Sequence, residues 1–276
     1  MEKRRMCPNC RAFITVDDKV CPYCDVQLGA PIIQKRSPQA ALGGLIPHAH
    51  FTTVVILLIN TGLFVATLLR SSTVTGRMSM DLDGQTLLDF GAKWGPSIAA
   101  GQWWRLITAG FLHGGLLHIL MNSWVLFDLG AQVEENFGTS RYLVFYFVST
   151  VTGFLASYYG SASLSIGASA GIFGLIGAMI AMGLRDRSSY GAAVRGLYIR
   201  WAVYGFLMGL LPFFNIDNFA HLGGLAGGFV VAYIAGTPGF NKTWERVWQI
   251  AAGVAVGATA LAFIDMFQWL TSQVER

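Results

Sequence analysis

Long apolar runs separated by short polar stretches dominate the chain from residue 51 to residue 270. A transmembrane helix needs about 20 predominantly apolar residues to cross the hydrocarbon core of a bilayer. Seven segments are long enough for this, so the pattern predicts an all-α polytopic membrane protein with seven spans. The segments are residues 51–69, 115–135, 141–159, 168–184, 197–213, 219–236 and 247–270.

The residues before the first apolar run are of a different kind. Residues 1–30 are polar and lack an apolar h-region, so no secretory signal peptide is expected. Residues 29–50 contain Pro31, Pro38 and Pro47, and we interpret this stretch as a linker. The pattern thus predicts a small N-terminal segment joined by a linker to a membrane domain.

The composition excludes several classes of protein. Only 12% of the residues are charged and 54% are hydrophobic, with a mean hydropathy of +0.51, whereas soluble proteins carry about 25% charged residues. A soluble enzyme, a disordered protein and a free nucleic-acid-binding domain are therefore excluded. The net charge of +4 comes from a few basic clusters, which we interpret as orientation signals. The expected partner is a lipid bilayer and not a nucleic acid.

All four cysteines lie in the N-terminal segment, as Cys7-x2-Cys10 and Cys21-x2-Cys24. Two such knuckles can direct four thiolates at one ion, which is the ligand set of a structural zinc site. The alternatives are two disulfides or four thiols without a ligand. A four-thiolate site leaves no open position for chemistry and favours a reducing compartment, so we expect a cytosolic N-terminus. The ribbon could bind a cytosolic partner, but the cysteine pattern does not indicate what the ribbon is for.

The basic residues predict which way the spans run. With a cytosolic N-terminus, most of the 19 Lys and Arg residues fall on the cytosolic side, as the positive-inside rule requires. We therefore expect a multi-pass protein of the plasma membrane with its C-terminus outside. Residues 70–114 then form a long, aromatic-rich outer loop that lies in the membrane interface.

Four polar side chains are predicted at one depth within the spans. His118 and Asn122 are four residues apart on one helix face, Ser169 begins the fourth apolar segment, and His221 begins the sixth. These three helices run in the same direction, so all four residues lie within about two turns of the outer helix ends. Each residue alone is compatible with helix packing. Together, a serine, a histidine base and further donors are the groups that acyl transfer needs.

At these residues the sequence resembles the rhomboid family of intramembrane serine proteases. The resemblance extends from about residue 103 to residue 228, with the first span supporting it. It rests on the order and spacing of six pieces. These are Trp104-Arg105, Phe111-Leu112-His113, His118-x3-Asn122, Glu134 with Phe137-Gly138, Gly167-x-Ser169, and Ala220-His221-x2-Gly224-x3-Gly228.

The resemblance implies a six-helix rhomboid core plus one C-terminal transmembrane helix, preceded here by a small zinc ribbon. The expected domains are a zinc-ribbon-like segment (1–28), the linker (29–50), the catalytic core (51–246), and the seventh helix with its tail (247–276).

The resemblance also assigns roles to residues. It implies that Ser169 is the nucleophile and His221 the general base, and that His118, Asn122 and the Ser169 backbone N–H stabilise the oxyanion. No cofactor is implied for catalysis. The implied substrates are single-span membrane proteins whose helices unwind easily near the outer face. Arg105 and Glu134 match positions that stabilise the outer loop and the far end of the second helix.

Two positions depart from the family pattern. Ala170 stands where glycine usually follows the serine, and Phe173 stands where tyrosine often packs against the catalytic imidazole. A phenylalanine keeps the stacking face and loses only the hydroxyl.

Two other functions compete with proteolysis. One is an inactive protein of the same fold that binds transmembrane clients, and the other is a transporter with His113, His118 and His221 on an ion path. An ion path should cross the membrane, whereas these side chains stop near one face. A further question is whether Asp217, four residues before His221, completes a triad. We expect a Ser169–His221 dyad, with the imidazole oriented by packing.

Overall fold

The computed structural model describes residues 4–7, 9–10, 12–28, 51–211 and 215–274. The chain divides into two compact units, Met1–Ile46 and Pro47–Arg276, and each is described here by itself. The predicted linker, residues 29–50, lies outside the described residues.

The N-terminal unit is a two-stranded antiparallel hairpin followed by a turn-rich segment. Strand β1 (Arg4–Met6) pairs with β2 (Phe13–Thr15). Its small core consists of Cys7, Ile14, Cys21 and Leu28, all buried. A core of this size supplies little folding energy, so this unit depends on a further source of stability.

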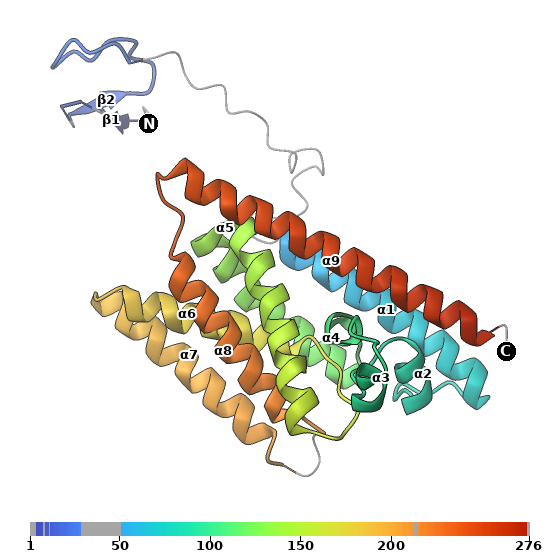
Figure 1. Cartoon of the computed structure of the whole chain (residues 1–276). Coiled ribbons are helices and arrows are strands. Elements are labelled where there is room, and N and C mark those ends of the chain that lie inside the picture. Colours follow the sequence, from blue (N-terminus) through green and yellow to red (C-terminus); the bar gives the residue numbers. More distant parts are fainter. Residues whose placement is uncertain (1–3, 8, 11, 29–50, 212–214, 275–276) are drawn as a thin grey trace. The chain divides into compact units, whose positions relative to one another are not determined.

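The second unit is helical, and its long helices correspond to the predicted apolar segments (Figure 1). The described elements are α1 (Phe51–Thr75), α2 (Gly84–Asp89), α3 (Gly95–Ala99), α4 (Arg105–Thr108), η3 (Ala109–Phe111), α5 (Leu116–Gly160), α6 (Ser169–Arg185), α7 (Ser189–Met208), α8 (Asn218–Ala235) and α9 (Lys242–Val274). Among the described residues, α1, α5, α8 and α9 are long and apolar enough to cross a membrane, and α6 is a shorter apolar helix. The all-α polytopic fold is confirmed.

Three predicted spans have different bounds in the structure. Segments 115–135 and 141–159 join into α5, which bends at Gly138, where φ is 76° and ψ is 161°. A positive φ is readily adopted only by glycine, so the bend is placed by this residue. The predicted span 197–213 is α7 instead, which begins about two turns earlier because the Ser188 side chain caps Gly191 N–H.

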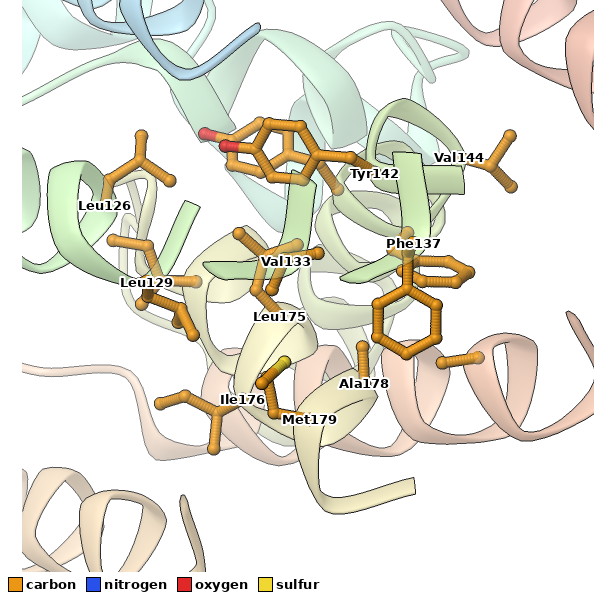
Figure 2. Packing of buried hydrophobic residues seen from close by; sticks show 14 of the residues in the cluster. Leu126, Leu129, Val133, Phe137, Tyr142, Val144, Leu175, Ile176, Ala178 and Met179 are labelled. Carbon is orange, nitrogen blue, oxygen red and sulfur yellow. The ribbon is translucent and has the colours of Figure 1, made fainter. Parts of the chain in front are cut away.

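The core of this unit lies between α5 and α6 (Figure 2). Leu126, Leu129 and Val133 from the first half of α5 face Leu175, Ile176 and Met179 of α6. Helices α6 and α8 pack backbone against backbone, because a methyl group at Gly228 would lie 2.1 Å from the carbonyl oxygen of Gly174. This close packing fixes the start of α6 relative to the start of α8.

The loop between α1 and α5 is folded and tied to its surroundings. Arg105 is fully buried, and its guanidinium donates to the carbonyl oxygens of Leu88 (2.6 Å) and Ala92 (3.0 Å) and to the Gln102 side chain (2.6 Å). Lys93 is also fully buried and donates from Nζ to the carbonyl oxygens of residues 161 (2.6 Å) and 163 (3.0 Å). These bonds join the loop to the segment that precedes α6.

Two carboxylates join α5 to its neighbours. Glu134 accepts hydrogen bonds from Thr52 at the start of α1 and from Thr139, beyond the bend in α5 (2.7 Å). Glu245 near the start of α9 accepts two hydrogen bonds from the buried guanidinium of Arg141 (2.6 and 2.8 Å). Such bidentate pairs fix geometry as well as adding energy, so α1 and α9 are both anchored to α5.

Candidate active site

Ser169 is the first residue of α6, and the turn before it is shaped by Gly167. The φ of Gly167 is +127°, and its N–H donates to the carbonyl oxygen of Ala109 in η3 (2.9 Å). A Cβ at this position would lie 2.8 Å from His118 Nε2 and 3.6 Å from Ser169 Oγ. Both polar atoms therefore flank the same glycine, and only glycine leaves the space between them open.

His118, in the first turn of α5, presents one ring nitrogen to this space. Its Nδ1 accepts from the backbone N–H of Gly114 (3.4 Å). A nitrogen that accepts carries no proton, so the neutral ring carries its proton on Nε2, which is the atom beside Gly167. His118 can therefore donate a hydrogen bond into the space between Gly167 and Ser169.

Asn122 follows one turn later on the same face of α5 and is buried. Its amide nitrogen donates to the His118 carbonyl oxygen (3.1 Å). An amide nitrogen has two N–H groups, so the second one is available for another acceptor.

His221 lies in the first turn of α8 and is buried. Its ring stacks on Phe173, with the ring centroids 3.9 Å apart and the planes 15° apart. Phe206 from α7 meets the same imidazole edge-on at 6.3 Å. Phe173 is one turn after Ser169, so the stack holds the imidazole against the first turn of α6.

The hydrogen bonds of the Asp217 carboxylate go to groups other than this imidazole. Asp217 is the N-cap residue of α8, and its carboxylate accepts from the backbone N–H groups of Phe219 and Ala220, both at 3.1 Å. The Ser157 hydroxyl donates to its other oxygen. The His221 Nδ1 atom has no hydrogen-bond partner among the described residues.

The structure accounts for the alanine at position 170. Its side chain is fully buried and faces Gly153 of α5, where a Cβ would lie 2.7 Å from that of Ala170. The methyl group is thus accommodated by a glycine on the neighbouring helix.

The structure brings Ser169 and His118 together around Gly167 and places His221 beside α6. His113 lies beside His118. His113 is fully buried, its ring lies 5.0 Å from that of His118, and neither of its nitrogens has a partner among the described residues. Sequence reasoning missed Lys93 and Ser157, whose partners lie 68 and 60 residues away. For Lys93, the only indication in the sequence was that it is a single lysine within an aromatic-rich loop.

Comparison with known proteins decides the family. The model of the Rhomboid domain matches residues 100–238, which is half of the chain and contains α4 to α8. The chain belongs to the rhomboid family. This confirms the resemblance in the sequence, and the matched stretch contains every residue of the candidate site.

Relatives at moderate identity include named proteases. The chain is 36% identical over 184 residues to the rhomboid protease GluP of Bacillus subtilis, covering 65% of this chain and 35% of that protein. It is 34% identical over 187 residues to the rhomboid-like protease 3 of Toxoplasma gondii, covering 66% of this chain and 69% of the relative. It is also 36% identical over 137 residues to the inactive RHOMBOID-like protein 8 of Arabidopsis thaliana, covering 49% of this chain and 38% of that protein.

The chain spans about a third to a half of the length of several curated rhomboid relatives that it matches. The family is therefore shown by the rhomboid domain and not by agreement along whole proteins. As a rhomboid-family protein with apolar spanning helices, the chain is an integral multi-pass membrane protein.

The N-terminal unit of this rhomboid protein holds a separate four-cysteine cluster. The four Sγ atoms lie within 4.8 Å of one another, with Cys7–Cys24 and Cys10–Cys21 each at 3.7 Å. All four thiols are free in the structure, which differs from the alternative of two disulfides. Tetrahedral ligands about 2.3 Å from a zinc ion are about 3.8 Å apart, so the donor set fits this metal.

Proposed function

We propose that this protein is an intramembrane serine protease that uses a Ser169–His221 dyad. The observation that carries the proposal is the His221 imidazole stacked on Phe173, one turn after Ser169. The position of His118 Nε2 beside Gly167 adds a donor near the serine hydroxyl. The family and its named proteases support the same reaction class.

The proposed reaction starts when His221 takes the proton of Ser169 Oγ as this oxygen bonds to the substrate carbonyl carbon. The carbonyl oxygen becomes an oxyanion, which accepts hydrogen bonds from His118 Nε2, the free N–H of Asn122 and the Ser169 backbone N–H. This backbone N–H lies at the start of α6, where helix donors lack intrahelical partners and the dipole favours negative charge.

His221 then gives its proton to the leaving amine as the peptide C–N bond breaks, which leaves an ester on Ser169. A water molecule hydrolyses the ester, with His221 taking its proton and returning one to Ser169 Oγ. Every proton in this cycle moves between Ser169, His221, substrate and water.

We propose single-span membrane proteins as substrates. The dyad residues begin α6 and α8 at the same end as the start of α5, so the scissile bond has to lie near one face of the membrane. With the N-terminus in the cytosol, this is the outer face of the plasma membrane. A substrate helix must unwind there, because a regular helix keeps its carbonyl groups in internal hydrogen bonds.

The competing function is a rhomboid-fold protein that binds transmembrane clients without cutting them, as the name of one Arabidopsis relative shows that inactive members exist. A fluorophosphonate probe separates the two, because it bonds covalently only to an activated serine. We expect labelling at Ser169 in the purified full chain and cleavage of at least one of a panel of single-span substrates. Absence of both would favour the inactive alternative.

Replacing Asp217 by Asn is expected to retain most of the proteolysis. The carboxylate caps α8 and binds Ser157, and an amide oxygen can still accept at a helix N-cap. Where aspartate orients a catalytic histidine, the same substitution lowers turnover by about 10⁴-fold. The measurement is turnover of a transmembrane substrate, with Ser157→Ala as a control for the cap contact. A loss of that size in a folded variant would make Asp217 a third catalytic member.

We further propose that the four-cysteine cluster binds structural zinc and that residues 1–28 fold around it. Cys7 N–H donates to the carbonyl oxygen of Ala12 (2.9 Å) and Cys21 N–H to that of Val26 (3.0 Å), so both knuckles close in the same way. The Val26 N–H and the Asn9 side chain lower the pKa of the Cys24 thiol to about 6. A thiolate is the form that binds zinc.

Metal analysis in reductant is expected to find about one zinc per chain, and the double variant Cys7→Ser with Cys21→Ser is expected to lose it. The membrane unit should stay folded and active in that variant and after deletion of residues 1–30, because a four-thiolate site offers no open position for chemistry. Loss of all proteolysis in either protein would contradict a purely structural or regulatory role. A metal-free wild-type protein would contradict the zinc site itself.

A further inference from the structure

A cavity of about 420 Å³ lies between α1, α5 and α9, away from the candidate active site. The cavity is lined by residues of all three helices together with Ile107 of α4 and Phe111 of η3. Its inner wall is buried: Ile56, Phe111 and Tyr146 are each at most 6% exposed. Phe263 of α9 meets Phe111 edge-on at 5.4 Å.

The cavity opens toward the bilayer between α1 and α9. Rim residues are partly exposed, with Val55 at 39%, Ile59 at 40% and Val256 at 52%. Both flanking helices are apolar enough to span a membrane. The surroundings of this opening are therefore lipid chains and not water.

No threonine of the wall has a hydroxyl hydrogen left to donate to a polar ligand. Thr52 donates to Glu134, and Thr150 and Thr259 each donate at 2.8 Å to a carbonyl oxygen one turn earlier in their own helices. Apart from these threonines and Tyr146, the lining side chains are aliphatic or phenylalanine. Apolar cavities of this kind exclude water and bind apolar molecules.

The volume selects among apolar occupants. A transmembrane helix of about 20 residues is about 30 Å long and about 10 Å wide with its side chains. Such a helix is several times larger than this cavity of about 420 Å³. A single flexible hydrocarbon chain can enter through the rim and fill the space.

We propose that this cavity is a binding site for one acyl chain of a membrane phospholipid, held between α1 and α9. The chain lies against Ile56 and Tyr146, and its headgroup remains in the interface. Because α9 is anchored to α5 through Arg141 and Glu245, the occupant fills a gap between fixed walls. The proposal does not depend on proteolysis.

The test uses the full chain in nanodiscs that contain a trace of phospholipid with a photoreactive acyl chain, followed by irradiation and peptide mapping. Cross-links are expected to concentrate on Ile59, Tyr146 and Val256. The double variant Ala255→Leu with Ala260→Leu fills the cavity, since both alanines line it. It should reduce these cross-links by at least about tenfold, which corresponds to about 1.4 kcal/mol.

The matched control is Ala258→Leu, on the same helix but outside the cavity lining, which should leave the cross-links unchanged. Ile59→Trp blocks the opening from α1 and replaces the double variant if that one does not fold. Cross-links spread evenly over exposed residues such as Leu58 and Val254, and unchanged by filling, would overturn the proposal. Displacement of the cross-links by a single-span transmembrane peptide would also overturn it, in favour of a protein helix.

Discussion

Turnover of a transmembrane substrate is expected to fall by about 10⁶-fold, to below detection, when either Ser169 or His221 is replaced by Ala. Without the hydroxyl there is no nucleophile, and without the imidazole nothing takes its proton. Because the two groups act as a unit, the double variant should be no worse than either single one. The measurement is cleavage by purified protein in bilayers, with fluorophosphonate labelling as a second readout.

The structure supplies a matched control for the serine. Ser163 lies in the same loop, six residues before Ser169, and is exposed, and its contact to Lys93 uses its backbone carbonyl oxygen. Ser163→Ala should therefore cut normally. The stack on Phe173 makes His221→Ala a larger disturbance, so its helix content and thermal unfolding have to match those of the wild type. Measurable cleavage by a folded Ser169→Ala variant would refute the proposed nucleophile.

The sequence predicted the common depth of the polar residues for a simple physical reason. The starts of apolar helices are tied to the membrane surface, so residues in the first turns of three parallel helices have to lie at one level. His118, Ser169 and His221 do begin α5, α6 and α8. These residues also have to lie close together in the plane of the membrane, and this depends on tight glycine contacts between the helices. In the sequence, the spacing of Gly224 and Gly228 only suggested such contacts.

Other features could not be predicted because they depend on pairs far apart in the chain. Arg141 and Glu245 are separated by 104 residues, and nothing local distinguishes either from an interfacial charge. The span predicted to start at residue 197 starts at Ser189 instead, because the Ser188 side chain caps α7 there. Hydrophobic pattern gives the existence of a helix, whereas caps and tertiary contacts set its ends.

Replacing Asn122 by Ala is expected to lower kcat by about 10²-fold if its free N–H reaches the oxyanion, because a single oxyanion donor contributes about that much. His118→Ala should act similarly. The charge that these donors stabilise forms only in the transition state. kcat and kcat/KM should therefore fall together, while KM stays nearly constant. A packing role would instead lower the unfolding temperature and leave kcat largely intact.

The chain contains a matched control for this substitution. Asn136 lies on the same helix and donates to the carbonyl oxygen of Gln132 (2.7 Å), four residues earlier, as Asn122 does to His118 (3.1 Å). Asn136→Ala removes the same local contact far from Ser169 and should leave kcat unchanged. In the double variant of His118 and Asn122 the loss should be less than the product of the single losses, since both donors serve one oxygen. Normal turnover in both single variants would mean that His118 and Asn122 serve helix packing. The Ser169 backbone N–H would then be the remaining proposed donor.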